Sequence, residues 1–200
     1  MKLLDDKLIK DTLKVIQSPY HFNINEKNPF TINAVISNAT FSPNSTYHIH
    51  SLEAFNCGDY TTINNPNNVY MVTSDVLTMR GGKYKGTLEY CNYSIVEWKT
   101  EKVLIGKDSL GRPVYEEQQV KVGEIPCILR YKDMTYTTND SINLTKPIYQ
   151  ITVRDSDASR KNFKLNENTY GDVKIYDTTY RIIDVDYSKK GIINIRLEKR

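Results

Sequence analysis

The residues of this chain that are best suited to metal or nucleophilic chemistry are its histidines and cysteines. His48 and His50 lie two apart in a strand-like run, so their rings share one face, but no third ligand lies near them in the sequence. Cys57, Cys91 and Cys127 are widely spaced and form no Cys-x-x-Cys pair, which argues against a zinc site. No serine, threonine or cysteine stands in a recognisable nucleophile motif. We therefore predict no metal, no cofactor and no catalytic residue, and we expect the protein not to be an enzyme.

Two short motifs suggest ion or nucleic-acid binding and fail on inspection. Asp155-Ser156-Asp157 resembles the start of a calcium loop, but the positions that need Gly and Glu hold Arg160 and Asn166. Arg80-Gly81-Gly82 resembles a nucleic-acid-binding repeat, but it occurs once, where a hairpin turn belongs. We interpret the first as an ordinary loop and the second as a turn.

One basic segment keeps a functional interpretation. The stretch from Asp155 to Tyr170 is predicted to be a long loop, and loops of this length tend to be functional or disordered. It carries Arg160, Lys161 and Lys164 beside acidic residues, so it could contact a polyanion weakly.

The composition limits the other possibilities. The 200 residues carry a net charge of +3, which is too small to predict a nucleic-acid partner by itself. Acidic and basic residues interrupt the N-terminal apolar run, and no run approaches transmembrane length. We expect a soluble protein, made in a cytoplasm with reduced thiols.

The elements that must position these residues are almost all strands. Residues 2–17 are the exception and predict an amphipathic helix ended by Ser18-Pro19. An isolated helix of this length is marginal in water, so it must pack on its own barrel or on a partner. The residues that we assign to such an assembly interface are Leu4, Leu8, Leu13 and Ile16.

The rest of the chain alternates short β-branched or aromatic runs with turns rich in Asn, Pro and Gly, which predicts an all-β fold of small antiparallel barrels. The same landmarks recur in the same order in both halves, which suggests two related units in tandem. The paired landmarks are Tyr47 and Tyr149, Gly58-Asp59 and Gly171-Asp172, Tyr70 and Tyr180, and Lys85-Gly86 and Lys190-Gly191.

We divide the chain into residues 1–92, a helix plus a barrel-like unit, residues 93–124, a connecting hairpin, and residues 125–200, a second barrel. The hairpin is predicted because two strand-like flanks enclose a turn that contains Asp108 and Gly111. Its apolar content is too high for a disordered linker.

Several segments of the second half follow one another in an order that a known family shares. They are the turn Asp108–Gly111, the strands Ile125–Arg130 and Tyr149–Arg154, and the C-terminal runs Val173–Val185 and Gly191–Leu197. Through these segments the second half resembles the head–tail joining, or head-closure, family of tailed phages. The resemblance covers residues 106–200, and the extra N-terminal half departs from a family whose members are often near half this length.

This resemblance implies a structural virion protein of the phage neck, assembled in the host cytoplasm. The implied form is a homo-oligomeric ring of twelve subunits that contacts the portal or adaptor protein and the tail proteins, touches packaged DNA weakly and binds no membrane. In such a ring the loop bearing Arg160, Lys161 and Lys164 would face the DNA channel. Two alternatives stay open: a stand-alone single-stranded nucleic-acid-binding protein with an OB-like barrel, and a tail-tube or distal-tail component.

Overall fold

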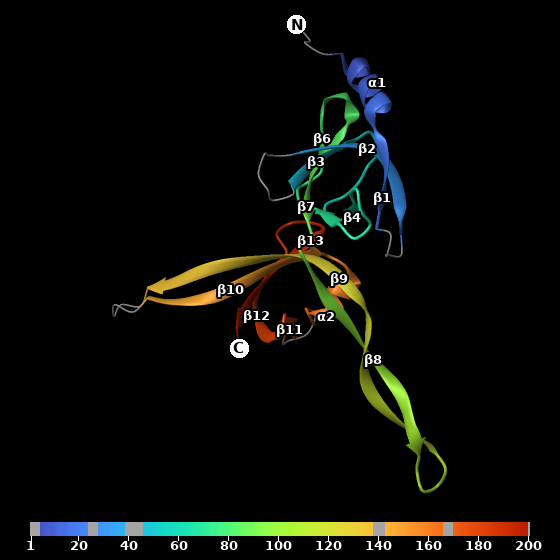
Figure 1. The fold of residues 1–200 in the computed structure, drawn as a ribbon, viewed down its shortest axis with the longest axis vertical. Helices are drawn as coiled ribbons and strands as arrows, with labels where there is room; N and C mark the ends of the chain where they lie inside the picture. Colours follow the sequence, from blue (N-terminus) through green and yellow to red (C-terminus); the bar gives the residue numbers. More distant parts are fainter. Residues whose placement is uncertain (1–4, 24–27, 39–45, 138–142, 166–169, 200) are drawn as a thin grey trace.

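The computed structural model describes residues 5–23, 28–38, 46–137, 143–165 and 170–199. The fold is all-β, with two barrel-like units and a short N-terminal helix, as the sequence predicts (Figure 1). Neither helix in the described residues has the length and apolar composition of a transmembrane span.

The elements of the N-terminal unit are α1 (Asp6–Ile16), β1 (Ser18–Phe22), β2 (Phe30–Asn38), β3 (Thr46–Ser51), β4 (Tyr60–Thr62), β5 (Val69–Val72), β6 (Leu77–Thr78), the 3-10 turn η1 (Arg80–Gly82) and β7 (Tyr84–Tyr90). Those of the C-terminal unit are β8 (Tyr93–Lys107), β9 (Pro113–Thr137), β10 (Asn143–Arg154), α2 (Asp157–Asn162), β11 (Asp172–Ile175), β12 (Thr178–Asp186) and β13 (Ile192–Lys199).

The N-terminal unit is a closed barrel. Its strands follow the order β3-β2-β1-β4-β5-β7, and a further antiparallel ladder between β3 and β7 closes the ring. Alternation along the strands sends one face inward: on β2, Ile32 and Ala34 are buried while Thr31 and Asn33 are exposed. The core also contains Phe22 and Leu88, both fully buried.

The C-terminal unit has the order β11-β12-β13-β10-β9-β8 and is nearly closed. Its core is aliphatic and centres on Ile151, Ile193, Ile195 and Leu197, all fully buried. The alternation of β13, which the sequence displays as isoleucines and a leucine between polar residues, places these side chains on the inner face.

Both units follow one path of antiparallel strands. Each unit begins with a meander of three strands, which is β1-β2-β3 in the first unit and β8-β9-β10 in the second. A second meander follows, and its last strand pairs with the third strand of the first meander. This pair is β7 with β3 in the first unit and β13 with β10 in the second. An edge-on tyrosine pair occurs on equivalent strands of both units. The ring centroids of Tyr47 and Tyr70 are 5.4 Å apart, and those of Tyr149 and Tyr180 are 5.3 Å apart. The landmarks that suggested two related units therefore fall on equivalent strands.

Helix α1 begins at Asp6, later than the predicted residue 2, and ends before Ser18-Pro19 as predicted. Asp5 caps it by accepting a hydrogen bond from the Lys7 backbone N–H at 3.1 Å, and Gln17 caps its C-terminus. The chain then turns into β1 at Ser18, because the residue before Pro19 disfavours the helical region. Strand β1 was not predicted from the sequence, since Pro19 and His21 obscure its alternation.

Two hairpins project from the C-terminal unit as arms (Figure 1). In the first, β8 and β9 pair from Tyr93 with Cys127 out to Lys107 with Pro113. In the second, β9 and β10 pair out to Thr137 with Asn143. Strand β9 thus belongs to both arms, and residues 93–124 form part of the second sheet as well as a hairpin.

Candidate assembly interface

Helix α1 is anchored to its own unit through one side of its surface. Leu13 is buried, and a Cβ built on Gly81 of η1 would lie 3.2 Å from the Ile9 side chain, so the helix rests on this turn. Leu8 and Ile16 are each 56% exposed. Of the four residues predicted for an assembly interface, Leu13 is therefore a packing residue, Leu8 and Ile16 are exposed, and Leu4 lies outside the described residues.

The tip of the first arm, residues 103–115, carries the densest set of exposed apolar side chains. Leu104 and Tyr115 are paired across the two strands, so they share a face, and they are 55% and 57% exposed. Exposed apolar side chains of this kind mark interaction surfaces when they gather. The exposed apolar residues of this arm tip are Val103, Leu104, Ile105, Leu110, Val114 and Tyr115.

The turn at the end of this arm is ordered by Asp108, as its predicted role in a hairpin requires. The Asp108 carboxylate accepts hydrogen bonds from the backbone N–H groups of Leu110 at 2.9 Å and Arg112 at 2.8 Å. Gly111 has φ +78°, a conformation that favours glycine. The turn therefore holds the apolar arm tip in a defined shape at the end of the hairpin.

The basic segment after β10 is not the open loop that the sequence predicted. Residues 157–162 form helix α2, capped by the Ser156 hydroxyl, which accepts from the Ser159 backbone N–H. Phe163 and Leu165, which follow the helix, are buried in the C-terminal core. The segment is part of the barrel's packing, so a freely swinging loop is the wrong description of it.

The cations of this segment differ in their surroundings. Arg160 makes two hydrogen bonds to the Asp155 carboxylate, at 2.6 and 2.9 Å, and lies 5.1 Å from the centre of the Tyr187 ring. The bond to Asp155 raises the pKa of the Arg160 guanidinium. Lys161 and Lys164 are exposed. Arg160 is thus paired within the chain, while Lys161 is exposed on α2.

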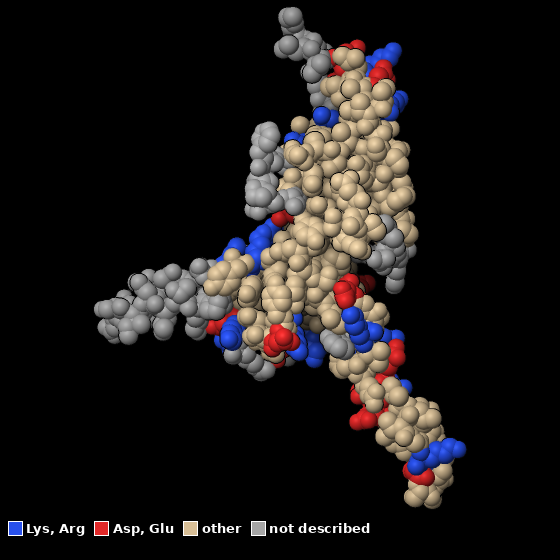
Figure 2. Space-filling view, in the orientation of Figure 1, with Lys and Arg blue, Asp and Glu red and all other residues tan. Residues whose placement is uncertain are grey.

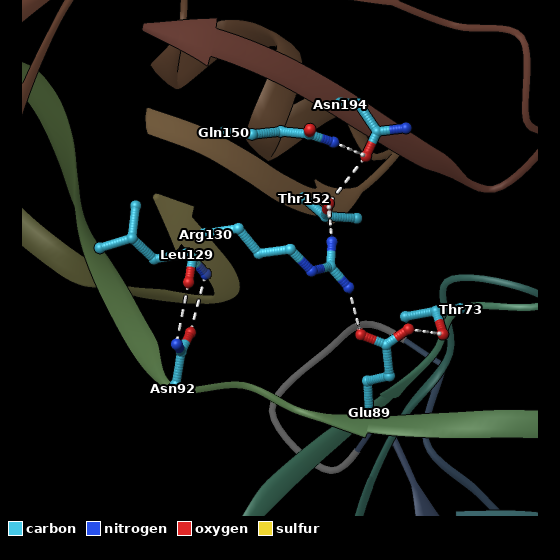
Figure 3. Close-up of polar contacts among 8 residues, drawn as sticks. All are labelled: Thr73, Glu89, Asn92, Leu129, Arg130, Gln150, Thr152 and Asn194. Carbon is cyan, nitrogen blue, oxygen red and sulfur yellow. Dashed lines mark hydrogen bonds and ion pairs between the residues drawn. The ribbon is translucent and has the colours of Figure 1, made fainter. Parts of the chain in front are cut away.

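A polar network joins the two units, and the sequence did not reveal it. Arg130 on β9 reaches Glu89 on β7 and also donates to the Thr152 hydroxyl at 3.3 Å (Figure 3). Asn194 accepts from Thr152 at 2.7 Å, and Gln150 donates to the same amide oxygen. The Glu89 carboxylate accepts in turn from the Thr73 hydroxyl. The network therefore ties β7 and the residue that follows β5 in the first unit to three strands of the second, β9, β10 and β13.

The backbone between the units is held by Asn92. Its side chain donates to the Leu129 carbonyl at 2.9 Å and accepts from the Leu129 N–H at 2.7 Å (Figure 3). Tyr60 adds a second link, because its hydroxyl donates to the Pro126 carbonyl. Asp59, which is almost fully buried, pairs with Arg154 at 3.3 Å. Because these links cross the junction at several points, the two units form one body.

The residues first considered for metal chemistry do not form a site. His48 and His50 do share a face of β3, with ring centroids 6.4 Å apart. Burial and the neighbouring Lys83, Lys85 and His48 lower the pKa of the His50 ring, which favours its neutral form. Among the described residues, no group of three potential ligands gathers around them or elsewhere.

The charged groups are distributed unevenly. The face of the N-terminal unit in Figure 2 has few charged side chains, whereas both signs are mixed over the C-terminal unit and its arm. The Arg80-Gly81-Gly82 motif forms the turn η1 next to α1, as predicted for a turn rather than a nucleic-acid-binding repeat. The surface thus offers no extended basic stripe in this view that would mark a polyanion channel by itself.

The comparisons place the C-terminal unit in a known family. The model of the YomX C-terminal domain matches residues 93–198, which cover both arms and the second barrel. The chain belongs to this family. The family is phage-derived, so the protein is phage-associated. No curated protein and no solved structure matches the chain significantly.

The structure brings together some predicted site residues and separates others. Asp108 and Gly111 lie in one turn at the arm tip, and Arg160 and Lys161 lie on one helix. The junction residues were missed because Arg130 and Arg154 each end a strand run like many surface arginines do. The sequence signal of Arg130 is a charge placed directly after three apolar residues, whereas Arg154 follows the alternating run Ile151-Thr152-Val153 and carries no such signal.

Proposed function

We propose that the protein is a structural subunit of a tailed-phage particle that assembles into a homo-oligomeric ring in the neck, between the portal or adaptor and the tail. It carries out no catalysis. The observation that carries the proposal is the first arm, an ordered hairpin that reaches away from the barrel and ends in exposed apolar side chains. Exposed apolar side chains that gather in this way mark a surface that another protein covers.

The phage-derived family adds support for a particle component. In the ring that we propose, the arms and α1 contact neighbouring subunits, while Lys161 on α2 and Lys164 in the turn after it contact the DNA in the channel weakly. Mixed charges suit this role, because a channel that bound DNA tightly would slow its passage.

The single-stranded nucleic-acid-binding alternative receives less support from the described residues. Its basic turn lies under α1, and Arg160 is paired with Asp155. A salt titration of DNA binding separates the two functions. A ring subunit binds DNA weakly and without sequence preference, whereas a binding protein holds single strands with a steep salt dependence.

The first test measures assembly. Light scattering after size exclusion and electron micrographs of the purified protein should show rings, and Leu104→Asp with Tyr115→Asp should shift them to monomers. Removing two buried apolar side chains from an interface costs about 3–6 kcal/mol in total, which raises the association midpoint by at least about a hundredfold. Leu77→Asp is the matched control, because Leu77 is 58% exposed on β6, away from the arm.

The second test locates the protein. Labelled antibody on intact particles should mark the neck. Label at the distal end of the tail, or along its length, would support the tail alternative instead and would reject the neck assignment. Labelling of no particle, together with a monomeric protein at all concentrations, would reject the structural role.

A further inference from the structure

The two units differ at one place in their shared topology, the seam where the first strand meets the fourth. In the N-terminal unit this seam is closed, because β1 pairs with β4 at Phe22 and Thr61. The equivalent strands of the C-terminal unit are β8 and β11, and no ladder joins them in the described residues. One barrel is therefore complete within the chain, and the other is left open along one edge.

Side-chain contacts bridge the open seam at its two ends. The Tyr176 backbone N–H donates to the Tyr93 hydroxyl at 3.0 Å, and the two rings meet edge-on. At the other end, the Asn162 amide donates to the Val96 carbonyl at 3.4 Å. Between these bridges lies a groove of about 340 Å³, lined by Ile95 and Val173 with Phe163 beneath them.

The groove therefore presents the edges of two strands above an apolar floor. Such an edge binds an added extended segment through its backbone groups, while pockets between the strands take alternate side chains. Strand β11 is only four residues long and pairs with β12 on its other side, and no strand of the described residues pairs with the edge that faces the groove.

The strand best suited to this edge is the distal part of β8. Only residues 93–96 of β8 line the groove, and the strand then continues along the arm to Lys107. Val103, Leu104 and Ile105 are consecutive apolar residues; Val103 and Leu104 point to opposite faces, and Ile105 lies at a register shift before Gly106. A continuous apolar run of this type is typical of a strand that is covered on both faces, but a two-stranded arm covers neither.

We propose that the arm tip of one copy docks in the open seam of a second copy, where residues 103–105 of β8 pair with β11 along the edge that faces the groove. In the N-terminal unit, β1 and β4 of the same chain close the seam. In the C-terminal unit, the proposed contact closes the equivalent seam with a strand from a second copy. It uses two different surfaces of one subunit, and such head-to-tail contacts generate closed rings when the rotation closes. The inference rests on the ring assembly proposed above and names its contact.

Photo-cross-linking tests the contact directly. Benzoylphenylalanine replaces Leu104 in an equal mixture of ¹⁵N-labelled and unlabelled full-length protein, and the illuminated sample is digested and analysed by mass spectrometry. We expect peptides that join position 104 of one isotope to residues 172–176 of the other. The same probe at Leu77 should give no link to β11.

A substitution in the groove provides the second test. Ser94 lines the groove and is exposed, so Ser94→Trp should fill it without removing a core side chain. We expect the intermolecular link to fall at least tenfold. If this variant does not fold, amide hydrogen exchange of the unmodified protein replaces it, and residues 172–176 should exchange at least tenfold more slowly in the assembled protein than in the monomer.

Three results would overturn the inference: links from position 104 to another part of a second copy, links only to a different phage protein, or no slowing of exchange at β11 on assembly. The proposed function is judged separately, by the mass of the assemblies and by their place in the particle. Rings that form with position 104 linked elsewhere would reject the seam contact alone.

Discussion

Gly58 and Gly191 meet backbone to backbone at the junction of the two units. A Cβ on Gly58 would lie 2.0 Å from the Gly191 carbonyl oxygen, and a Cβ on Gly191 would lie 2.1 Å from the Cys57 carbonyl oxygen. Both residues have φ near +90°, where side chains are strained. These are the Gly-Asp and Lys-Gly landmarks of the sequence, and glycine is required at both because the two backbones approach so closely.

Gly191→Ala should therefore destabilise the protein strongly. The added methyl group must displace the Cys57 backbone while its own residue stays at positive φ, so we expect a loss of about 3 kcal/mol or more in the free energy of unfolding. Denaturation by urea measures the loss. Gly106→Ala is the matched control, since nothing lies within 4 Å of a Cβ at that position in the arm, and an equal loss in both variants would contradict the close approach.

Arg130 and Glu89 should contribute to the stability of the junction. Their side chains are 39% and 29% exposed, so solvent screens the pair in part. Arg130→Met leaves Glu89 and Thr152 with fewer partners and should cost about 1–2 kcal/mol. A double-mutant cycle with Glu89→Gln should return a coupling energy of about 0.5–1 kcal/mol.

The control for this pair is Arg181 with Glu198, which lies within the C-terminal unit and has an Arg side chain that is 60% exposed. Arg181→Met should change the free energy of unfolding by less than about 0.5 kcal/mol. Equal effects of Arg130→Met and Arg181→Met would mean that the junction network adds nothing beyond a surface ion pair.

Phe163 should prove structural although it lies in the basic segment. It is 1% exposed in the C-terminal core, so Phe163→Ala should cost about 3–5 kcal/mol. Deleting residues 157–166 removes both Phe163 and Leu165 and should prevent folding of the second barrel. Lys161→Ala, on the exposed side of α2, should leave the melting temperature within about 1 °C, and a folded, stable deletion variant would contradict this packing.

The sequence predicted the fold class, helix α1 and most strands because alternation and turn residues are local signals. The runs at Val69–Val72 and Ile192–Leu197 lie within the strands observed there. Strand β1 was missed because Pro19 and His21 obscure its alternation, and α2 was missed because six residues show too little helical period. The length of the segment from Asp155 to Tyr170 suggested a loop, while the burial of Phe163 depends on tertiary packing.

The candidate interface was predictable in part. An arm at residues 93–124 and its turn at Asp108 follow from two strand runs around a turn, and both are present in the structure. The role of Leu13 could not be separated from that of Leu8, since both lie in one amphipathic pattern and only the position of η1 decides which is covered. The junction network depends on contacts between residues 41 apart in the chain, such as Glu89 and Arg130, for which the sequence holds no local signal.

The three cysteines should titrate as free thiols with different access. All are unpaired, Cys91 and Cys127 are buried, and Cys57 is half-buried. Burial raises the pKa of Cys127 to about 12 and raises the pKa of Cys57 and Cys91 as well. The thiolate is the reactive form, so at pH 8 a thiol reagent should modify at most about one cysteine per native chain quickly and all three after denaturation without reductant. Fewer than three in the denatured protein would indicate a disulfide.

Leu8 and Leu13 should separate the two roles of helix α1. Leu13 is buried against its own unit, so Leu13→Asp should release the helix and raise amide hydrogen exchange over residues 6–16 to the rate of a free peptide, while the barrels stay folded. Leu8 is 56% exposed, so Leu8→Asp should leave this protection within about a factor of two and instead weaken assembly, measured by light scattering. Asp lowers the helix propensity at both positions, but its charge is favourable in the first turn at Leu8 and unfavourable in the last turn at Leu13, so Leu8→Asn and Leu13→Asn supply the charge-free comparison. If Leu8→Asp also releases the helix, α1 packs through both faces on its own unit and is no part of an interface. If neither variant affects assembly, the contacts between subunits lie on the arms alone.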